Sequence, residues 1–403
     1  MKQICHIPIV WLLLLIACLL SQGITTAHAQ TILGQSCAMS GPTSFLGQEM
    51  NRGAKAYFDK YAANDVVLKV LDDKYEPEKC ILNTEKLMGE KVAALFAYVG
   101  TPTAKVAVPL AMKQKTVFFG AFTGAGFLGD PKTNPFSFSV RASYDAEIEN
   151  MVRRLKEDLN VSKISLFVQR DAFGLTGLRG AVKAVGKIAG VEIIPAIPEI
   201  PKNSDSKDKW NAFWNAVPNY RRNSIAVGRD ARKISGNKDI QAVILVGAYR
   251  PCAAAINLWK KIDFDAIFIN ISFVGSNALA ESLGGNTKNV LISQVVPDPW
   301  DKSLPLVREY QEAMGDKYGF VSLEGYISAK IIHKAIKNAG SSVNSESLRE
   351  KLETMSSYDI GGLNVSFAPD DHRGLDQVYL TRIEKEKKGK SFKFKYVDRI
   401  EKE

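Results

Sequence analysis

The chain has 403 residues, of which 46% are hydrophobic and 24% charged, and this composition excludes an intrinsically disordered protein. A chain of this length is expected to fold into two or three domains. The formal net charge is +10, but the basic residues are spread along the chain apart from a run at 385–390. Nucleic acid is therefore not an expected partner.

The N-terminus has the three parts of a secretory signal peptide. Lys2 supplies the positive charge, residues 9–20 form an unbroken apolar run, and Ala27-His28-Ala29 has the small-x-small pattern that signal peptidase accepts. The run is too short to cross a hydrocarbon core of about 30 Å. We expect cleavage after Ala29 (signal peptide 1–29) and a periplasmic protein that does not itself span the membrane. The alternative is a lipoprotein modified at Cys18.

Short β-rich runs alternate with helical periods over the first third of the chain. The predicted strands are 31–39, 66–71, 92–99 and 116–119. The predicted helices between them are 45–61, 78–89 and 103–114. This alternation predicts a parallel sheet that is covered by helices on both faces.

A second alternation follows a loop at 123–136 that is rich in Gly and Pro. Its predicted helices are 146–159, 177–189 and 252–261, and its predicted strands are 164–169, 191–195, 242–246, 266–270 and 290–294. Residues 201–240 are expected to hold one helix plus a surface insertion. Two similar units in series predict an α/β protein of two Rossmann-like lobes, each a parallel sheet flanked by helices.

Three amphipathic helices without a strand between them come next, at 304–317, 323–339 and 345–355. Terminal strands are predicted at 363–367, 378–383 and 392–397. Helices that cannot bury an apolar face alone must pack on an existing sheet. The chain is therefore expected to return to the first lobe and then to cross once more to the second.

Three cysteines remain in the mature chain, in an oxidising compartment. Cys37 ends the first predicted strand and Cys80 follows the second, and a βαβ unit would place them side by side. A disulfide between Cys37 and Cys80 is the favoured prediction, which leaves Cys252 free. The alternative is three small buried thiols.

Motifs for catalysis, cofactors and metals are weak. Residues 124–129 spell G-x-G-x-x-G, but Asp130 and Pro131 follow, and they cannot continue the helix that a dinucleotide site needs. The two histidines of the mature chain, His333 and His372, lie in no metal or catalytic motif. The sequence therefore predicts no enzyme, no cofactor and no metal.

The positive signal lies at the corners where predicted strands meet helices, at 40–43, 100–103 and 121–124. In open α/β sheets, ligands bind beyond the carboxyl ends of strands, where helix N-termini present free N–H groups. Backbone N–H groups and hydroxyls that converge there suit a carboxylate. Ordinary helix capping uses the same residue types, so the corners alone leave both interpretations open.

A set of motifs recurs in order along nearly the whole mature chain and resembles the branched-chain amino-acid-binding (Leu/Ile/Val-binding) family of type I periplasmic binding proteins, the solute receptors of ABC transporters. They are GQSCAMSGP at 34–42 with Gly47 and Gly53, DDKYEP at 72–77, GTPT at 100–103, RASY at 141–144 with Glu147, DAFG at 171–174, EGY at 324–326 and GGL at 361–363.

The resemblance implies two lobes joined by three hinge crossings, near Arg141, near residues 296–297 and near Ser357. The N-terminal lobe would then comprise 30–140 plus 297–356, and the C-terminal lobe 141–296 plus 357–403. The ligand is expected in the cleft between the lobes.

The resemblance also implies the binding residues. Gly100, Thr101, Ala121 and Thr123 match the positions that hold the ligand carboxylate in the first lobe. Tyr249 matches an aromatic residue that closes over the ligand from the second lobe.

The chain departs from the family at Ser272, near which the acidic partner of the ligand ammonium falls. An ammonium left unpaired in a closed cleft would cost several kcal/mol. Either another group, such as Asp171, supplies the charge, or the ligand is not an α-amino acid.

Three phenylalanines, Phe122, Phe173 and Phe273, are placed at corners that face the expected cleft, and Arg250 stands beside Tyr249. A carboxylate ligand with an apolar or aromatic body would use the rings, and Arg250 would pair a second anion. The alternative is that the rings belong to the cores of the lobes and that Arg250 is a solvated rim residue.

These observations predict a monomeric periplasmic solute-binding protein that captures a small carboxylate-bearing ligand by hinge closure and delivers it to an inner-membrane ABC permease. The ligand is expected to be an amino acid or a related organic or aromatic acid. The alternative partner is a membrane signalling receptor that reads the closed form of a ligand sensor. An enzyme on the same scaffold is disfavoured, because the chain shows no paired base and nucleophile.

Overall fold

The computed structural model describes residues 30–341, 343–385 and 392–403. The expected signal peptide, its cleavage after Ala29 and the alternative lipid site at Cys18 lie outside the described residues. Within these ranges no helix combines the length and the apolar character that a membrane span requires.

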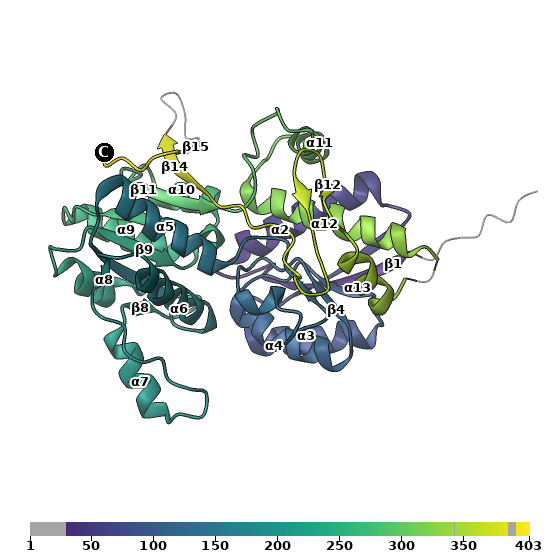
Figure 1. The fold of residues 1–403 in the computed structure, drawn as a ribbon, viewed down its shortest axis with the longest axis horizontal. Coiled ribbons are helices and arrows are strands. Elements are labelled where there is room, and N and C mark those ends of the chain that lie inside the picture. The colour runs from purple at the N-terminus through teal and green to yellow at the C-terminus, as the bar shows by residue number, and fades with distance from the viewer. Residues whose placement is uncertain (1–29, 342, 386–391) are drawn as a thin grey trace, which may run out of the picture.

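Two β-sheets organise the chain, and each is the centre of one lobe (Figure 1). The sheet of the first lobe has five parallel strands in the order β2-β1-β3-β4-β5. They are β1 (Thr31–Cys37), β2 (Val66–Asp72), β3 (Ala94–Phe96), β4 (Val117–Phe119) and β5 (Ser137–Phe138). The first-lobe helices are α2 (Ser44–Tyr61), α3 (Pro77–Gly89), α4 (Thr101–Lys113), α11 (Pro305–Met314), α12 (Phe320–Ala339) and α13 (Ser345–Glu353). The three late helices return to this lobe, since α12 and α11 pack on α2 and α13 contacts β4.

The sheet of the second lobe has eight strands in the order β15-β14-β11-β10-β9-β6-β7, with β8 also paired to β6. They are β6 (Lys163–Gln169), β7 (Glu192–Ile193), β8 (Asn219–Tyr220), β9 (Ala242–Val246), β10 (Ile267–Asn270), β11 (Val290–Gln294), β14 (Tyr379–Lys385) and β15 (Phe392–Tyr396). Only β14 and β15 run antiparallel to their neighbours. The helices are α5 (Tyr144–Leu159), α6 (Ala172–Lys187), α7 (Lys207–Ala216), α8 (Gly228–Ser235), α9 (Tyr249–Lys261) and α10 (Ser276–Leu283). The expected α/β class with two helix-flanked parallel sheets is confirmed.

Local sequence sets the helix ends that border the space between the lobes. The Ser143 side chain caps α5 by accepting a hydrogen bond from the Ala146 N–H, and Asp171 caps α6 in the same way through the Phe173 N–H. Helix α3 begins at Pro77, where the missing N–H costs nothing. These caps place polar side chains at the carboxyl ends of the strands.

The structure differs from the predicted elements in two segments. Residues 201–240 hold two helices, α7 and α8, and the short strand β8, where one helix was expected. Helix α10 was not predicted at all, because it spans only eight residues between Gly275 and Gly284, both in left-handed conformations. A helix of about two turns is too short for its apolar period to stand out in the sequence.

The third crossing lies later than expected. Residues 358–374 stay with the first lobe: the short strands β12 (Tyr358–Asp359) and β13 (Asn364–Val365) pair with each other, and Phe367 contacts the ring of Phe138. The Gly374 N–H then donates to the carbonyl of Ser139 at 2.8 Å. The boundary expected at Ser357 is therefore wrong, and the chain crosses between Gly374 and β14.

The expected disulfide between Cys37 and Cys80 is not formed. Both cysteines, and Cys252, are free, buried thiols. The Cys37 sulfur faces the carbonyl of Gly47 in α2, whereas the Cys80 sulfur faces the carbonyl of Thr103 in α4. The two side chains belong to different hydrophobic clusters of the lobe. Although β1 and α3 belong to one βαβ unit, the sulfurs of Cys37 and Cys80 thus lie in separate parts of the core.

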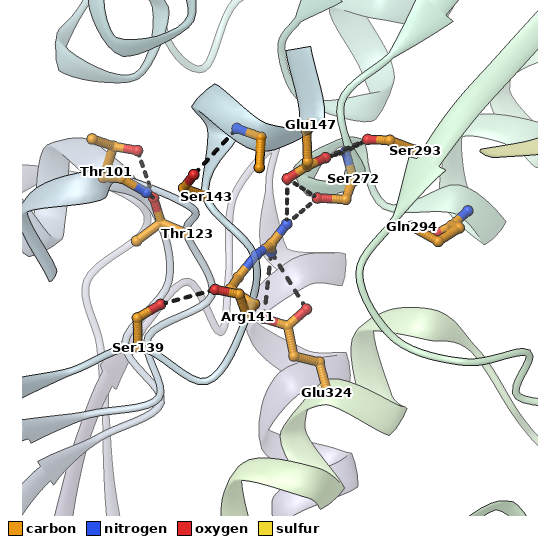
Figure 2. Close-up of polar contacts among 12 residues, drawn as sticks. Thr101, Thr123, Ser139, Arg141, Ser143, Glu147, Ser272, Ser293, Gln294 and Glu324 are labelled. Atoms are coloured by element: carbon orange, nitrogen blue, oxygen red, sulfur yellow. Dashed lines mark hydrogen bonds and ion pairs between the residues drawn. The ribbon is translucent and has the colours of Figure 1, made fainter. Parts of the chain in front are cut away.

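The hinge between the lobes is held by the buried guanidinium of Arg141, in the first crossing (Figure 2). Arg141 Nη2 lies 3.0 Å from Glu147 of α5, in the second lobe, and Nη1 lies 3.4 Å from both carboxylate oxygens of Glu324 of α12, in the first lobe. The Glu147 carboxylate also accepts hydrogen bonds from the Ser272 N–H and the Ser293 hydroxyl. One cation is thus shared by two carboxylates from different lobes.

Close packing between α2 and α12 positions Glu324 for this contact. A Cβ atom on Gly53 would lie 1.8 Å from the carbonyl oxygen of Ser322, and one on Gly325 would lie 2.2 Å from that of Met50. These are backbone atoms, so a side chain at either position forces the helices apart. Glycine is required at both crossing points.

We expect Gly53→Ala to lower the free energy of unfolding by about 2 to 4 kcal/mol, because the methyl group collides with rigid backbone. The matched control is Gly186→Ala in α6, where nothing lies within 4 Å of the new Cβ. The control should be neutral or stabilising by up to about 1 kcal/mol, since alanine favours the helix. Chemical denaturation measures both, and equal effects of the two substitutions would contradict this account of the packing.

A second prediction concerns pH. Burial raises the pKa of Glu324 from its ordinary 4.5 to about 7, with Arg141 opposing the shift and Glu147 adding to it. The folded state therefore holds a proton that the unfolded state has lost, and Glu324 makes the protein progressively less stable as pH rises from 4.5 to 7. We expect Glu324→Gln to remove this loss. The unfolding free energy of the variant minus that of the wild type should therefore increase as pH rises from 4.5 to 7. A difference between the two proteins that does not change with pH would contradict the assignment.

Candidate functional site

The carboxyl ends of β3 and β4 place two threonines side by side in the first lobe. Thr101 is the first residue of α4, Thr123 follows β4, and their hydroxyl oxygens lie 2.7 Å apart (Figure 2). Gly100, which precedes Thr101, has a φ of +98°, and a Cβ there would lie 2.1 Å from the ring of Tyr75. Glycine is therefore needed to let the Tyr75 ring close over this corner.

Unused hydrogen-bond donors surround the two threonines. Among the backbone hydrogen bonds of the described turns, loops and helix ends, none has the amide N–H of Thr101 or Ala121 as its donor. The Tyr144 hydroxyl is buried and forms no hydrogen bond of good geometry in the described residues, although Thr123 and the Gly124 backbone lie close enough to lower its pKa. Burial outweighs them and raises the pKa of Tyr144 to about 12, so it stays a neutral O–H donor. Buried polar groups are rarely left unpaired, so this concentration of donors favours a site for an acceptor.

Aromatic rings from both lobes pack together next to these donors. The Phe273 ring, from the second lobe, lies 5.3 Å from that of Phe122 in the first lobe and 4.7 Å from that of Phe173. The Tyr144 ring lies 5.3 Å from Phe173. All four rings are buried. Phe122 and Phe173 were predicted to face the ligand, and the structure places both where the lobes meet.

Tyr249 connects the second lobe to the first corner of the first lobe. It begins α9, and its hydroxyl donates to the carbonyl of Pro42 at 2.8 Å. Its ring also meets Phe45 edge-on, with centroids 5.9 Å apart. Together with the burial of Thr101 and Thr123, which are 1% and 0% exposed, this contact shows that the lobes are shut upon one another.

Arg250 and Ser272 lie apart from the threonine corner. Arg250 is exposed and its guanidinium lies over the Tyr249 ring, 5.8 Å from the centroid, as expected of a rim residue. The Ser272 hydroxyl accepts from Arg141 and donates to Glu147 in the hinge cluster. Ser272 is thus fully engaged by protein groups.

Asp171, the residue considered as a replacement for the missing acid, is also engaged. One carboxylate oxygen accepts from the Phe173 N–H at 2.9 Å, and the other accepts from Gln169 Nε2 at 2.7 Å and faces Arg222 at 3.5 Å. Burial raises the pKa of Asp171, and Arg222 acts against that rise. Its charge is compensated within the protein.

Two residues of the site, Tyr75 and Tyr144, were not assigned roles from the sequence. Both lie in motifs that the sequence shares with the periplasmic family, DDKYEP and RASY, and this was the available signal. The placement of Tyr75 depends on left-handed conformations at Lys74 and Tyr75, with φ of 55° and 63°. Such conformations are rare for these residue types and cannot be foreseen from the sequence.

Among the described residues no cluster of acidic, His or Cys side chains could hold a metal ion.

Comparison with solved structures identifies the same architecture in bacterial receptors. A possible leucine/isoleucine/valine-binding protein from Rhodopirellula baltica SH 1 is 34% identical over 90% of this chain and 96% of its own, with a TM-score of 0.78. An extracellular ligand-binding receptor from Verminephrobacter eiseniae is 26% identical over 88% of this chain and 98% of its own, with a TM-score of 0.73.

A more distant structure shares the fold. The branched-chain amino acid transporter substrate binding protein from Streptococcus pneumoniae, solved in complex with isoleucine, is 15% identical over 91% of this chain and all of its own, with a TM-score of 0.71. No curated protein sequence matches the chain significantly. The family model described as periplasmic binding protein matches residues 32–390, and the chain therefore belongs to the periplasmic binding protein family, whose members bind substrates and are not enzymes.

Proposed function

We propose that this protein is an exported solute receptor that traps a small carboxylate-bearing molecule between its lobes and delivers it to an inner-membrane ABC permease. The observation that carries the proposal is the set of unused donors at the Thr101 corner. The Thr101 and Ala121 N–H groups have no backbone acceptor in the described loops and helix ends, the buried Tyr144 hydroxyl has no well-formed hydrogen bond there, and the hydroxyls of Thr101 and Thr123 lie 2.7 Å apart at the same corner. A carboxylate, with two oxygens that accept several hydrogen bonds, matches this set.

Closure follows from where the remaining contacts lie. The ligand carboxylate binds first to the first-lobe corner, and the rings of Phe173, Phe273 and Tyr249 then arrive with the second lobe and exclude water. Because these contacts exist only when the lobes meet, they favour the closed state over the open one. The Tyr249 hydroxyl bond to Pro42 fixes the closed position.

The engaged acids support a ligand without an α-ammonium group. In a shut, aromatic site an ammonium needs a carboxylate acceptor. Ser272 stands where the family resemblance puts that acid, and it is bonded to Arg141 and Glu147. Asp171 is bonded to Gln169 and Arg222. We therefore favour an organic or aromatic acid over an amino acid.

Matched ligand pairs test this choice directly. The pairs are phenylalanine against 3-phenylpropanoate and leucine against 4-methylpentanoate, which differ only in the ammonium. We expect the acid of each pair to bind more tightly by isothermal titration calorimetry on protein stripped of ligand by denaturation and refolding. Tighter binding of the amino acids would contradict the choice of ligand class, whereas binding of neither, with a non-acidic molecule found by mass spectrometry of the unstripped protein, would contradict the carboxylate site itself.

The donors can be tested one at a time with the tightest acid from that panel. We expect Thr101→Ala to weaken binding by roughly 1 to 3 kcal/mol, because the ligand and the Thr123 hydroxyl both lose a partner. The control is Thr176→Ala in α6, whose hydroxyl donates to the carbonyl of Ala172 within its own helix. Unchanged affinity in Thr101→Ala would remove this corner from the binding site.

A further inference from the structure

The segment 219–223 reaches from the second lobe to the first, and its side chains make four polar contacts there. Its strand β8 pairs with the carboxyl end of β6, where Tyr220 lies opposite Gln169. The Arg170 N–H donates to the carbonyl of Tyr220 at 2.7 Å, which fixes Arg222 and Asn223 just beyond the strand. Asn223 is left-handed, with a φ of 57°, so the chain turns sharply there.

Two adjacent side chains of this segment, Arg222 and Asn223, form hydrogen bonds with the first lobe. Arg222 Nη2 lies 2.6 Å from the Glu76 carboxylate, at the N-terminus of α3. The Asn223 amide donates to the other oxygen of Glu76 at 2.7 Å and to the carbonyl of Lys74 at 3.1 Å. The Thr43 hydroxyl donates to the Asn223 side-chain oxygen at 2.9 Å. Charged and neutral hydrogen bonds thus converge on one point of contact.

Each half of the contact is held in place by its own lobe. On the second-lobe side, Asp171 faces Arg222 at 3.5 Å and also accepts from Gln169. On the first-lobe side, Asp72 accepts hydrogen bonds from the N–H groups of Met39, Ser40 and Lys74, and it fixes the turn that presents Glu76. When the lobes part, Arg222 keeps Asp171 but loses Glu76. The contact with Glu76 is therefore a difference between the open and the closed state.

The contact is also connected to the threonine corner. The Gln169 amide that bonds Asp171 donates to the Tyr75 hydroxyl as well, at 3.2 Å, across the lobe interface. Tyr75 is the residue directly before Glu76, and its ring lies against Gly100. A hydrogen bond from Gln169 and a packing contact of the Tyr75 ring thus connect the Arg222 contact to the Thr101 corner.

We propose that Arg222 and Asn223 form an interlobe latch with Glu76, which stabilises the closed form without any ligand. Part of the ligand-free protein is then already closed. Because the ligand has to supply less free energy to close the lobes, the latch increases the apparent affinity for every ligand. Because the ion pair is half-buried and salt screens such contacts, the latch weakens as ionic strength rises. Arg222 and Glu76 are positioning residues that need not touch the ligand.

Small-angle X-ray scattering on stripped, ligand-free protein tests the latch, with ensemble fits that give the closed-to-open ratio. Glu76→Gln is the decisive variant, because it removes the pair across the lobes and leaves Arg222 with Asp171. We expect the ratio to fall by roughly fivefold in Glu76→Gln and in Arg222→Gln at low salt, with a larger radius of gyration and an unchanged melting temperature. Raising the NaCl concentration should open the wild type and have little effect on Glu76→Gln.

The matched control is Asp239→Asn, which breaks the pair between Lys163 and Asp239, 2.9 Å apart and within the second lobe. This variant should scatter like the wild type at every salt concentration. Identical curves for wild type and Glu76→Gln would overturn the proposal, and so would a wild type that is fully open at low salt. Opening of Asp239→Asn to the same extent would also overturn it, because the effect would then be one of net charge.

Discussion

The guanidinium of Arg141 is the interaction on which the two-lobed arrangement depends. It is buried at the first crossing and shared between Glu147 of the second lobe and Glu324 of the first. Burying ionisable groups is costly unless each finds close partners, and removing Glu147 would leave the guanidinium short of a partner in the interior. The same guanidinium lies over the Phe122 ring, 5.2 Å from its centroid, so the hinge cluster is in contact with the aromatic part of the site. The cluster thus ties both lobes to the first crossing.

The sheets explain why the donors of the site lie where they do. Parallel strands deliver successive strand-to-helix corners to one edge, so residues 100–101 and 121–123 meet although a helix separates them in sequence. The second lobe contacts the first at this edge through Tyr249, Phe273 and Gln169. The donors of the Thr101 corner thus come from the first lobe, with the Tyr144 hydroxyl added from the start of α5, and most of the apolar covering comes from the second lobe. A molecule with an acidic end and an apolar body fits this arrangement, because its acid would meet the donors and its body the rings.

Much of the fold could be predicted from the sequence, because strands buried on both faces are strongly apolar. The predicted strands 242–246 and 290–294 coincide with β9 and β11. The Thr101 and Thr123 corners were predicted from the same alternation together with the family motifs. The disulfide could not be excluded in this way, since which face of a sheet a sulfur occupies depends on packing. The crossing near Ser357 was taken from the family resemblance, and residues 358–374 form only two-residue strands, which carry no periodic signal that could have corrected it. The roles of Tyr75 and Arg222 depend on left-handed turns at 74–75 and 223, which neighbouring groups impose.

The central claim is that two lobes close on an acid held by the first lobe. A crystal structure of the protein purified without denaturation, with the molecule it carries, tests this most directly. The account predicts density between the lobes for a small molecule whose carboxylate accepts hydrogen bonds from the Thr101 and Ala121 N–H groups, with its apolar body against Phe173 and Phe273. A bound molecule that lacks an acidic group at this corner, or that sits outside the lobe interface, would contradict it.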